Sequence, residues 1–186
     1  MNLSINKRAV SCKREAKRLR REGKIPAIVY AEGKKGENIF IEEAQFCAVL
    51  RGIQLGYLPT TVLLLKDEDS NEFKAIVKDI QYHPTTYRIL HLDFVRLIDN
   101  IEVNVKVPIE CFGAAECPGV KLGGVLRQVI RHLSVRCLPE NIPTKLSLDV
   151  KSLSMSQSKR LKAIDIPKGV RPLVDLNEVA AVIAKR

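Results

Sequence analysis

The sequence lacks tryptophan altogether, and only 5% of its 186 residues are aromatic. Hydrophobic residues still make up 46% of the chain, an ordinary share for a globular protein, so we expect packed cores built from aliphatic side chains. No apolar stretch follows the first charges as it would in a signal peptide, and no run approaches the roughly 18 apolar residues of a membrane-spanning helix. The sequence therefore predicts a cytoplasmic protein without a membrane partner.

Paired metal-binding or disulfide-forming cysteines are also missing. The five cysteines are odd in number and include no C-x-x-C pair, whereas a zinc site or a disulfide framework uses paired, closely spaced residues. The chain has no glycine-rich phosphate loop and no G-x-S-x-G motif of a serine hydrolase. We therefore expect free thiols, no cofactor, no metal, no small-molecule substrate and no catalytic residues.

Acidic residues are scarce near the N-terminus, where basic residues gather. Residues 1–35 hold eleven Lys and Arg against three Glu, and the formal net charge of the whole chain is +10. A charge excess confined to one segment indicates a binding surface for a polyanion rather than a general contribution to solubility. The first fifth of the chain is therefore the expected site of contact with an anionic partner.

The densest part of this segment is residues 13–24, which carry seven Lys and Arg. On a helix, Arg14, Lys17, Arg18 and Arg21 share one face because residues three and four apart are neighbours. A nucleic-acid backbone relieves the mutual repulsion of such cations and releases counterions on binding. A merely solvated face would usually mix charge signs, and a membrane-surface helix would carry aromatic or repeated leucine residues that this stripe lacks. The pattern favours a nucleic-acid backbone over either alternative.

The first part of the chain alternates short helices and strands. We expect helices at 13–22 and 42–51 and extended segments at 27–30, 38–41, 60–65, 73–82 and 88–97. In the last of these, Leu90, Leu92 and Phe94 fall on one face, while His91 and Asp93 fall on the other. Mixed strands with two helices and short turns predict a small antiparallel barrel or an α+β domain.

The composition changes after Asp99 and Asn100, which form a plausible linker. Residues 101–109 alternate strictly between apolar and polar side chains, which is the clearest strand signal in the sequence. Further alternation covers 125–138, 144–150 and 173–184, and 153–161 is the only segment here with a helical pattern. We therefore expect two domains, 1–97 and a mostly β domain at 98–186, and a mainly β fold class with few helices.

The polar residues His83, His91 and Asp93 allow more than one interpretation. Two histidines and a carboxylate could hold a metal ion, and Asp93 could orient His91 as a general base. An exposed His–Asp pair without a special role is also compatible with the sequence. Contact with RNA fits better, because histidine can stack on bases or donate hydrogen bonds to phosphates and 2′-hydroxyls. The rival hypothesis to RNA binding is a hydrolase or metal-dependent enzyme centred on these three residues.

Three groups of strings resemble one known family. Residues 19–30, LRREGKIPAIVY, resemble the opening of ribosomal large-subunit protein L-twenty-five, whose long form is also called general stress protein Ctc. The strings DIQYHP at 79–84 and ILHLDF at 89–94 resemble its later hairpin. GGVLRQV at 123–129 and LPxxIP at 138–143 resemble the extra C-terminal domain of the long form. The matches follow the order of the family and span nearly the whole chain.

This resemblance implies a fold, a partner and a set of contact residues. It implies a six-stranded barrel-like N-terminal domain with short helices, followed by a Ctc-type β domain. The N-terminal domain would bind 5S rRNA at the internal loop of the fourth helix of that RNA, chiefly from the minor-groove side. The protein would be a structural constituent of the large subunit of the cytoplasmic ribosome, with other large-subunit components as neighbours. Position by position, the implied RNA contacts are Arg8, Arg18, Arg20, Tyr30, His91 and Asp93, with Lys13 and Lys17 as supporting phosphate contacts.

The chain departs from the family pattern at two places. Ala31 stands where the family usually has glycine after the tyrosine, so we expect a different turn after Tyr30. Cys12, Lys13 and Arg14 replace a glycine-rich Gly-Lys-Gly before the basic helix. We expect Arg14 to add a phosphate contact at this second position.

Overall fold

The chain is divided into two compact units. The computed structural model describes residues 2–8, 13–31, 36–67 and 71–185. Its two units are Met1–Val103 and Asn104–Arg186, and both consist mainly of β-strands with few helices, which confirms the expected fold class. None of the helices in the described ranges is long and apolar enough to cross a membrane.

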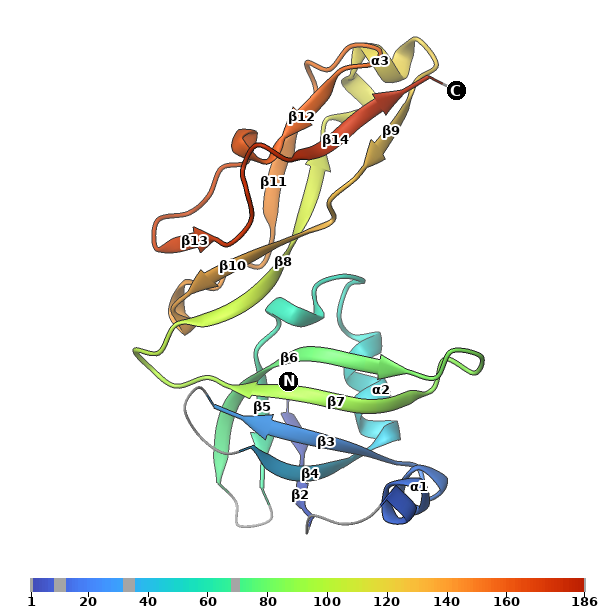
Figure 1. Ribbon diagram of the computed structural model, residues 1–186, viewed down its shortest axis with the longest axis vertical. Helices are drawn as coiled ribbons and strands as arrows, with labels where there is room; N and C mark the ends of the chain where they lie inside the picture. The colour runs from blue at the N-terminus through green and yellow to red at the C-terminus, as the bar shows by residue number, and fades with distance from the viewer. Residues whose placement is uncertain (1, 9–12, 32–35, 68–70, 186) are drawn as a thin grey trace. The chain divides into compact units, whose positions relative to one another are not determined.

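A single mixed sheet forms the first unit (Figure 1). Its strands are β1 (Asn2–Ser4), β2 (Asn6–Lys7), β3 (Lys24–Tyr30), β4 (Glu37–Glu42), β5 (Leu63–Lys66), β6 (Glu72–Tyr82) and β7 (Ile89–Arg96). The strand order is β1-β5-β6-β7-β3-β4-β2. The β1–β5 and β3–β7 pairs are parallel, so the purely antiparallel barrel considered from the sequence is wrong.

The first strand segment nearly closes this sheet into a barrel. Only Ile5 separates β1 from β2, yet β1 pairs with β5 at one edge of the sheet and β2 pairs with β4 at the other. The Ile5 N–H donates to the Lys66 carbonyl over 2.9 Å, and the Lys7 ammonium lies 2.6 Å from the Asp67 carboxylate. Counted as one bent strand, this segment gives the expected six-stranded, barrel-like sheet.

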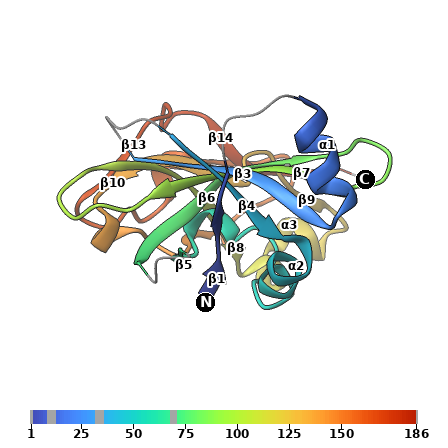
Figure 2. The ribbon, with the colours of Figure 1, turned by 90° about the horizontal axis from the view of Figure 1, so that it is seen from below.

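Two helices accompany the sheet and lie on opposite sides of the β3–β4 pair (Figure 2). Helix α1 (Lys13–Arg21) ends before Gly23, whose φ of +75° is a conformation that glycine adopts at little cost. Helix α2 (Glu43–Arg51) inserts the fully buried Phe46 into the core, edge-to-face against Phe94 at 6.5 Å between ring centroids. A short 3-10 helix, η1 (Leu58–Thr60), occupies the start of the segment expected to be extended from residue 60.

The second unit contains two smaller sheets. Its strands are β8 (Val103–Phe112), β9 (Val125–Gln128), β10 (His132–Cys137), β11 (Leu146–Asp149), β12 (Ser158–Arg160), β13 (Val170–Pro172) and β14 (Val179–Ala184). They form the orders β11-β8-β10-β13 and β12-β14-β9. The connections include α3 (Pro118–Lys121) and the 3-10 helices η2 (Ala114–Glu116), η3 (Pro139–Asn141) and η4 (Leu161–Ala163).

The helix predicted at 153–161 is wrong. This segment consists of turns followed by β12 and η4, and Ser156 adopts a φ of +61°, which an α-helix does not allow. The Gln157 side chain accepts a hydrogen bond from the Ser154 N–H, and the Ser156 N–H donates to the Ile183 carbonyl on β14. The Gln157 side chain and the hydrogen bonds to β14 therefore outweigh the local helical pattern.

The alternation at 125–138 belongs to two strands rather than one. The N–H groups of Val129 and Ile130 both donate to the Ala180 carbonyl, which bends the chain between β9 and β10 and sends them to different sheets. Likewise, only the end of the 173–184 segment is a strand, because β13 stops at Pro172 and β14 begins at Val179.

Candidate nucleic-acid interface

The strand registers place most of the predicted contact residues on one face of the first sheet. Buried residues such as Ala27, Ile39 and Leu92 are paired across β3, β4 and β7, which identifies the inner face. Their neighbours in sequence must point to the opposite face, because side chains alternate along a strand. We call this opposite side the outer face; it carries the expected Tyr30, His91 and Asp93.

One row of the outer face crosses four strands. Ile28 pairs with Asn38 on β4 and with Asp93 on β7, and Asp93 in turn pairs with Asp79 on β6. At the other end, the Arg8 N–H donates to the Asn38 carbonyl over 3.0 Å. The row therefore runs from a cation at the edge to two carboxylates over the middle of the sheet.

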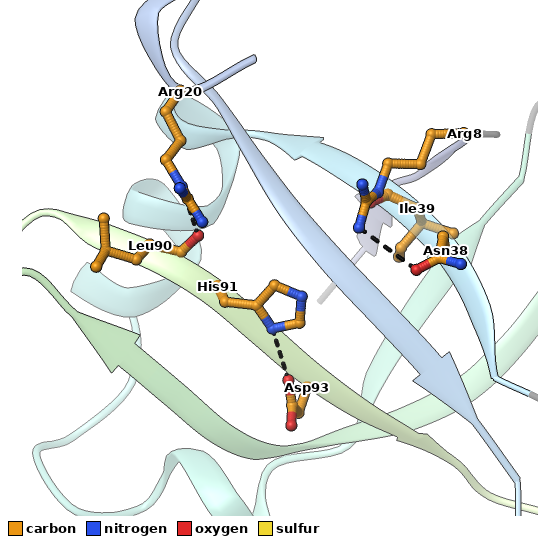
Figure 3. A network of polar contacts seen from close by, with 7 residues as sticks. All are labelled: Arg8, Arg20, Asn38, Ile39, Leu90, His91 and Asp93. Carbon is orange, nitrogen blue, oxygen red and sulfur yellow. Dashed lines mark hydrogen bonds and ion pairs between the residues drawn. The ribbon is translucent and has the colours of Figure 1, made fainter. Parts of the chain in front are cut away.

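Arg8 is held against the edge of this face by two hydrogen bonds. Its Nε donates to the Ile39 carbonyl over 3.1 Å, and its Nη2 donates to the Asn38 side-chain oxygen over 3.4 Å (Figure 3). Guanidinium groups carry five N–H donors, so several remain for a ligand. The expected contact residue is thus oriented before any partner binds.

His91 and Asp93 form a pair on β7. Their side chains point toward one another, and His91 Nδ1 lies 2.7 Å from Asp93 Oδ1 (Figure 3). Both side chains are partly exposed, at 21% and 29%, so the pair is open to a ligand while its geometry is fixed. Within the described residues, the hydrogen-bond partner of the Asp93 side chain is His91.

Tyr30 lies beside these carboxylates. Partial burial raises the pKa of its hydroxyl, and the negative charges of Asp93 and Asp79 raise that pKa further. The phenol therefore keeps its proton over a wider pH range and stays available as a hydrogen-bond donor.

Helix α1 supplies a cationic surface next to the outer face. Arg14, Lys17, Arg18 and Arg21 line one concave surface together with Glu15, as the three- and four-residue spacing predicts. Arg18 is partly neutralised, because its guanidinium lies 3.9 Å from Glu15 and 3.6 Å from Glu22.

The other cations of α1 are open to a partner. Lys13, Arg14, Lys17 and Arg21 are exposed, and none of them has an ion pair or hydrogen bond from its side chain to a described residue. They are therefore the cations best placed to meet phosphates.

Arg20 links the helix to the strand that carries the His–Asp pair. Its Nε donates to the Leu90 carbonyl over 3.0 Å, immediately before His91 in the chain (Figure 3). This part-buried bond, together with the burial of Leu19, holds the helix at the beginning of β7. The structure thus brings together all nine predicted contact residues, on the outer face or on the adjoining helix.

The three residues of the rival enzyme hypothesis do not form one site. His83 lies in the turn after β6, where its Nδ1 accepts hydrogen bonds from the N–H groups of Thr85 and Thr86 over 3.4 and 3.3 Å. His91 and Asp93 lie on β7 and bond to each other. Among the residues that the structure describes, there is no group of three or more His, Cys, Asp or Glu side chains that could hold a metal ion.

Sequence reasoning missed part of this interface. Asp79, Gln81 and Asn38 pair with or adjoin the predicted residues on the outer face, but they were not proposed as contacts. Asp79 and Gln81 were already in the recognised string at 79–84, so its alternation with the buried face could have indicated them. Ala31 is buried and does not adopt a positive φ, so this backbone position does not require the glycine that the family usually has.

The arrangement suits a ligand that combines anionic and donor groups. Cations lie on α1 and at Arg8, on either side of a central strip in which Asp79 and Asp93 present acceptors. Carboxylates would repel phosphates, but they accept hydrogen bonds from base amino groups and from 2′-hydroxyls. The surface is therefore chemically matched to a groove of RNA, with phosphates at the flanks and hydroxyl or amino donors in the middle.

Comparison with known proteins gives a consistent result along the whole chain. The model of the ribosomal L25p family matches residues 3–94, and that of the C-terminal domain of ribosomal protein TL5 matches residues 102–186. Large ribosomal subunit proteins bL25 of Chlamydia abortus and Chlamydia trachomatis are 45% and 46% identical to the chain over 186 residues. The corresponding protein of Chlamydia pneumoniae is 42% identical, and each alignment covers 100% of both chains.

The environment of Tyr30 yields a prediction. Asp93→Asn removes the larger of the two carboxylate contributions and should lower the pKa of Tyr30, while Asp79→Asn should lower it less. Neither variant should restore the ordinary value, because burial is the largest cause of the shift. Carbon-13 NMR of the labelled tyrosine ring during a pH titration measures this pKa. An unchanged Tyr30 titration in a folded Asp93→Asn protein would contradict the proposed proximity.

Proposed function

Since the chain belongs to the bL25 family, in the long form that carries a TL5-type C-terminal domain, it is a structural constituent of the large ribosomal subunit, and we propose that its first unit binds 5S rRNA through the outer face and α1. This family consists of structural ribosomal proteins rather than enzymes, and its members act in the cytoplasmic ribosome. Binding of 5S rRNA is typical of the family, which makes it the first candidate for the partner.

The observation that carries this proposal is the row from Arg8 to Asp79. A guanidinium at one end and the α1 cations at the other flank provide phosphate contacts on two sides of a groove. Between them, the His91–Asp93 pair and Tyr30 meet the groove interior with fixed acceptors and donors. In A-form RNA, the wide and shallow minor groove displays 2′-hydroxyls and base edges to such groups.

Each predicted residue has a role in this proposal. Arg8, Lys13, Arg14, Lys17 and Arg18 contact phosphates, and Arg20 positions α1 while its remaining donors face the RNA. Tyr30 and His91 donate to riboses or bases, and Asp93 accepts from a 2′-hydroxyl or a base amino group. We propose residues 1–97 as the 5S rRNA-binding domain and 98–186 as a C-terminal domain that contacts other large-subunit components.

The division of labour between the two domains can be tested directly. Residues 1–97 contain all strands of the seven-stranded sheet and both α1 and α2, so the fragment should fold and bind 5S rRNA without the rest of the chain. A gel shift with 5S rRNA compares this fragment with the full chain and with residues 98–186. Binding by the full chain but not by the folded fragment would contradict the proposal.

Lys17 should contribute to affinity through its charge. Lys17→Ala should weaken binding modestly and reduce the slope of log K against log salt by up to about one, since one phosphate contact is lost. Lys162→Ala, which removes an exposed lysine of the second unit, is the matched control and should leave the slope of the 5S rRNA complex unchanged. Equal slopes for the wild type and Lys17→Ala would mean that Lys17 is solvated in the complex.

Asp93 provides a test that separates hydrogen bonding from simple electrostatics, because the two predict opposite effects of its removal on RNA affinity. Removing a carboxylate should strengthen binding to a polyanion, but Asp93→Ala and His91→Ala should each cost about 1–3 kcal/mol of affinity by leaving a hydrogen-bond partner unsatisfied. Asp99→Ala, an exposed carboxylate in the linker, is the control and should not weaken binding.

Stability measurements separate a contact from a structural role for this pair. Both side chains are partly exposed and lie outside the core, so the thermal midpoints of the two variants should change little. Variants that unfold early but bind normally once folded would identify the pair as a structural clamp, and unchanged or tighter binding by Asp93→Ala would remove Asp93 from the interface.

A further inference from the structure

A pocket of about 290 Å³ adjoins the proposed interface, and the proposed function assigns it no ligand. It lies between the end of α1, the beginning of β3 and the turn that joins β6 to β7. The residues that define it are Arg20, Arg21, Ile25, His83, Ile89 and Leu90. Its volume is just below the range of about 300–1,000 Å³ for ligand pockets, so it suits one small ring system rather than an extended ligand.

The floor and the rim of the pocket differ in polarity. Ile25 and Ile89 are 1% and 8% exposed and belong to the core, and Leu90 is half-buried beside them. Around this apolar floor, four basic side chains outnumber one carboxylate, that of Glu43. Arg21 is exposed and has no partner for its side chain among the described residues, whereas Arg88 is held 2.9 Å from Glu43.

His83 adds a hydrogen-bond donor of fixed orientation. Backbone N–H groups can only donate, so the bonds from Thr85 and Thr86 require an unprotonated Nδ1 on His83. The proton of the neutral ring is then on Nε2, on the side away from the turn. Because the turn itself fixes this tautomer, His83, which lines the pocket, carries an N–H donor before any ligand binds.

Arg20 connects the pocket with the proposed RNA surface. Its side chain lines the pocket, and its Nε bonds to the carbonyl of Leu90, which precedes the His91–Asp93 pair. An RNA backbone that runs along α1 and the outer face would therefore pass the mouth of the pocket. Unstacked bases in RNA are commonly recognised by apolar contact together with hydrogen bonds to their edges.

We propose that this pocket receives one unstacked nucleotide of the RNA bound on the outer face, an inference that rests on the proposed function. Its base lies against Ile25, Ile89 and Leu90, and a base oxygen or ring nitrogen accepts the Nε2 hydrogen bond of His83. Its phosphate is bound by Arg21 at the rim. The pocket thereby extends recognition from the groove to a single flipped base.

Mononucleotides test the pocket separately from the large RNA surface. In methyl and amide NMR spectra of the full chain, AMP or UMP should shift the signals of Ile25, Ile89 and Leu90, whereas inorganic phosphate should shift only residues of the rim. His83→Asn keeps a side-chain oxygen that can accept from the turn and removes the Nε2 donor, so it should weaken nucleotide binding about twofold to tenfold. His132→Asn, an exposed histidine of the second unit, is the matched control and should have no effect.

A second variant removes part of the floor. Leu90→Ala shortens the floor but keeps the backbone carbonyl that holds Arg20, and it should also weaken nucleotide binding. A Tyr87 amide that stays protected from hydrogen exchange in His83→Asn, through its bond to the carbonyl of residue 83, would show that the turn is intact, so that weaker binding reports the lost donor.

The possible outcomes distinguish the pocket from the proposed function. If 5S rRNA binds but mononucleotides leave the floor signals unmoved, the pocket proposal is overturned and the proposed function stands. Floor shifts with inorganic phosphate alone would also overturn it, because they would indicate a simple anion site. If mononucleotides bind and 5S rRNA does not, the assignment of the pocket to bound RNA is overturned together with the proposed function.

Discussion

The parallel pairing of β3 with β7 is the constraint on which the candidate interface depends. It joins segments more than sixty residues apart and places Ile28 opposite Asp93 and Tyr30 opposite Val95. A slip of one residue would turn His91 and Asp93 into the core, because the side-chain period of a strand is two. The bond from Arg20 to the Leu90 carbonyl fixes α1 at the beginning of the same pair.

Much of this arrangement could be predicted from local patterns. Leu92 and Phe94 are buried while His91 and Asp93 are partly exposed, as the alternation predicts, and α1 ends before Gly23 as expected. The resemblance at 19–30 and 79–94 identified the family and the barrel. The pairing of β3 with β7 and the closure of the barrel by residues 2–7 could not be predicted in this way, because both depend on contacts distant in sequence.

One expectation failed where tertiary contacts outweigh local signals. The pattern at 153–161 resembles a helix, yet hydrogen bonds to β14 organise it as turns and a short strand. The charge analysis was also incomplete. Residues 36–103 carry six Lys and Arg against eleven Asp and Glu, whereas residues 104–186 carry fourteen Lys and Arg against seven Asp and Glu. In the summed charge of residues 36–186 these two contributions nearly cancel, so the sum does not reveal that residues 104–186 are basic. A net-basic second unit suits anionic neighbours in the large subunit.

The most direct measurement of the central claim is an experimental structure of the full chain bound to 5S rRNA. The account predicts that the outer face of β3 and β7 meets an RNA groove, with Asp93 within hydrogen-bond distance of a 2′-hydroxyl or a base amino group. Arg8 and the open cations of α1 should contact phosphates on the two flanks of that groove. A complex in which this face is turned to solvent or to protein, with the RNA held elsewhere on the chain, would contradict it.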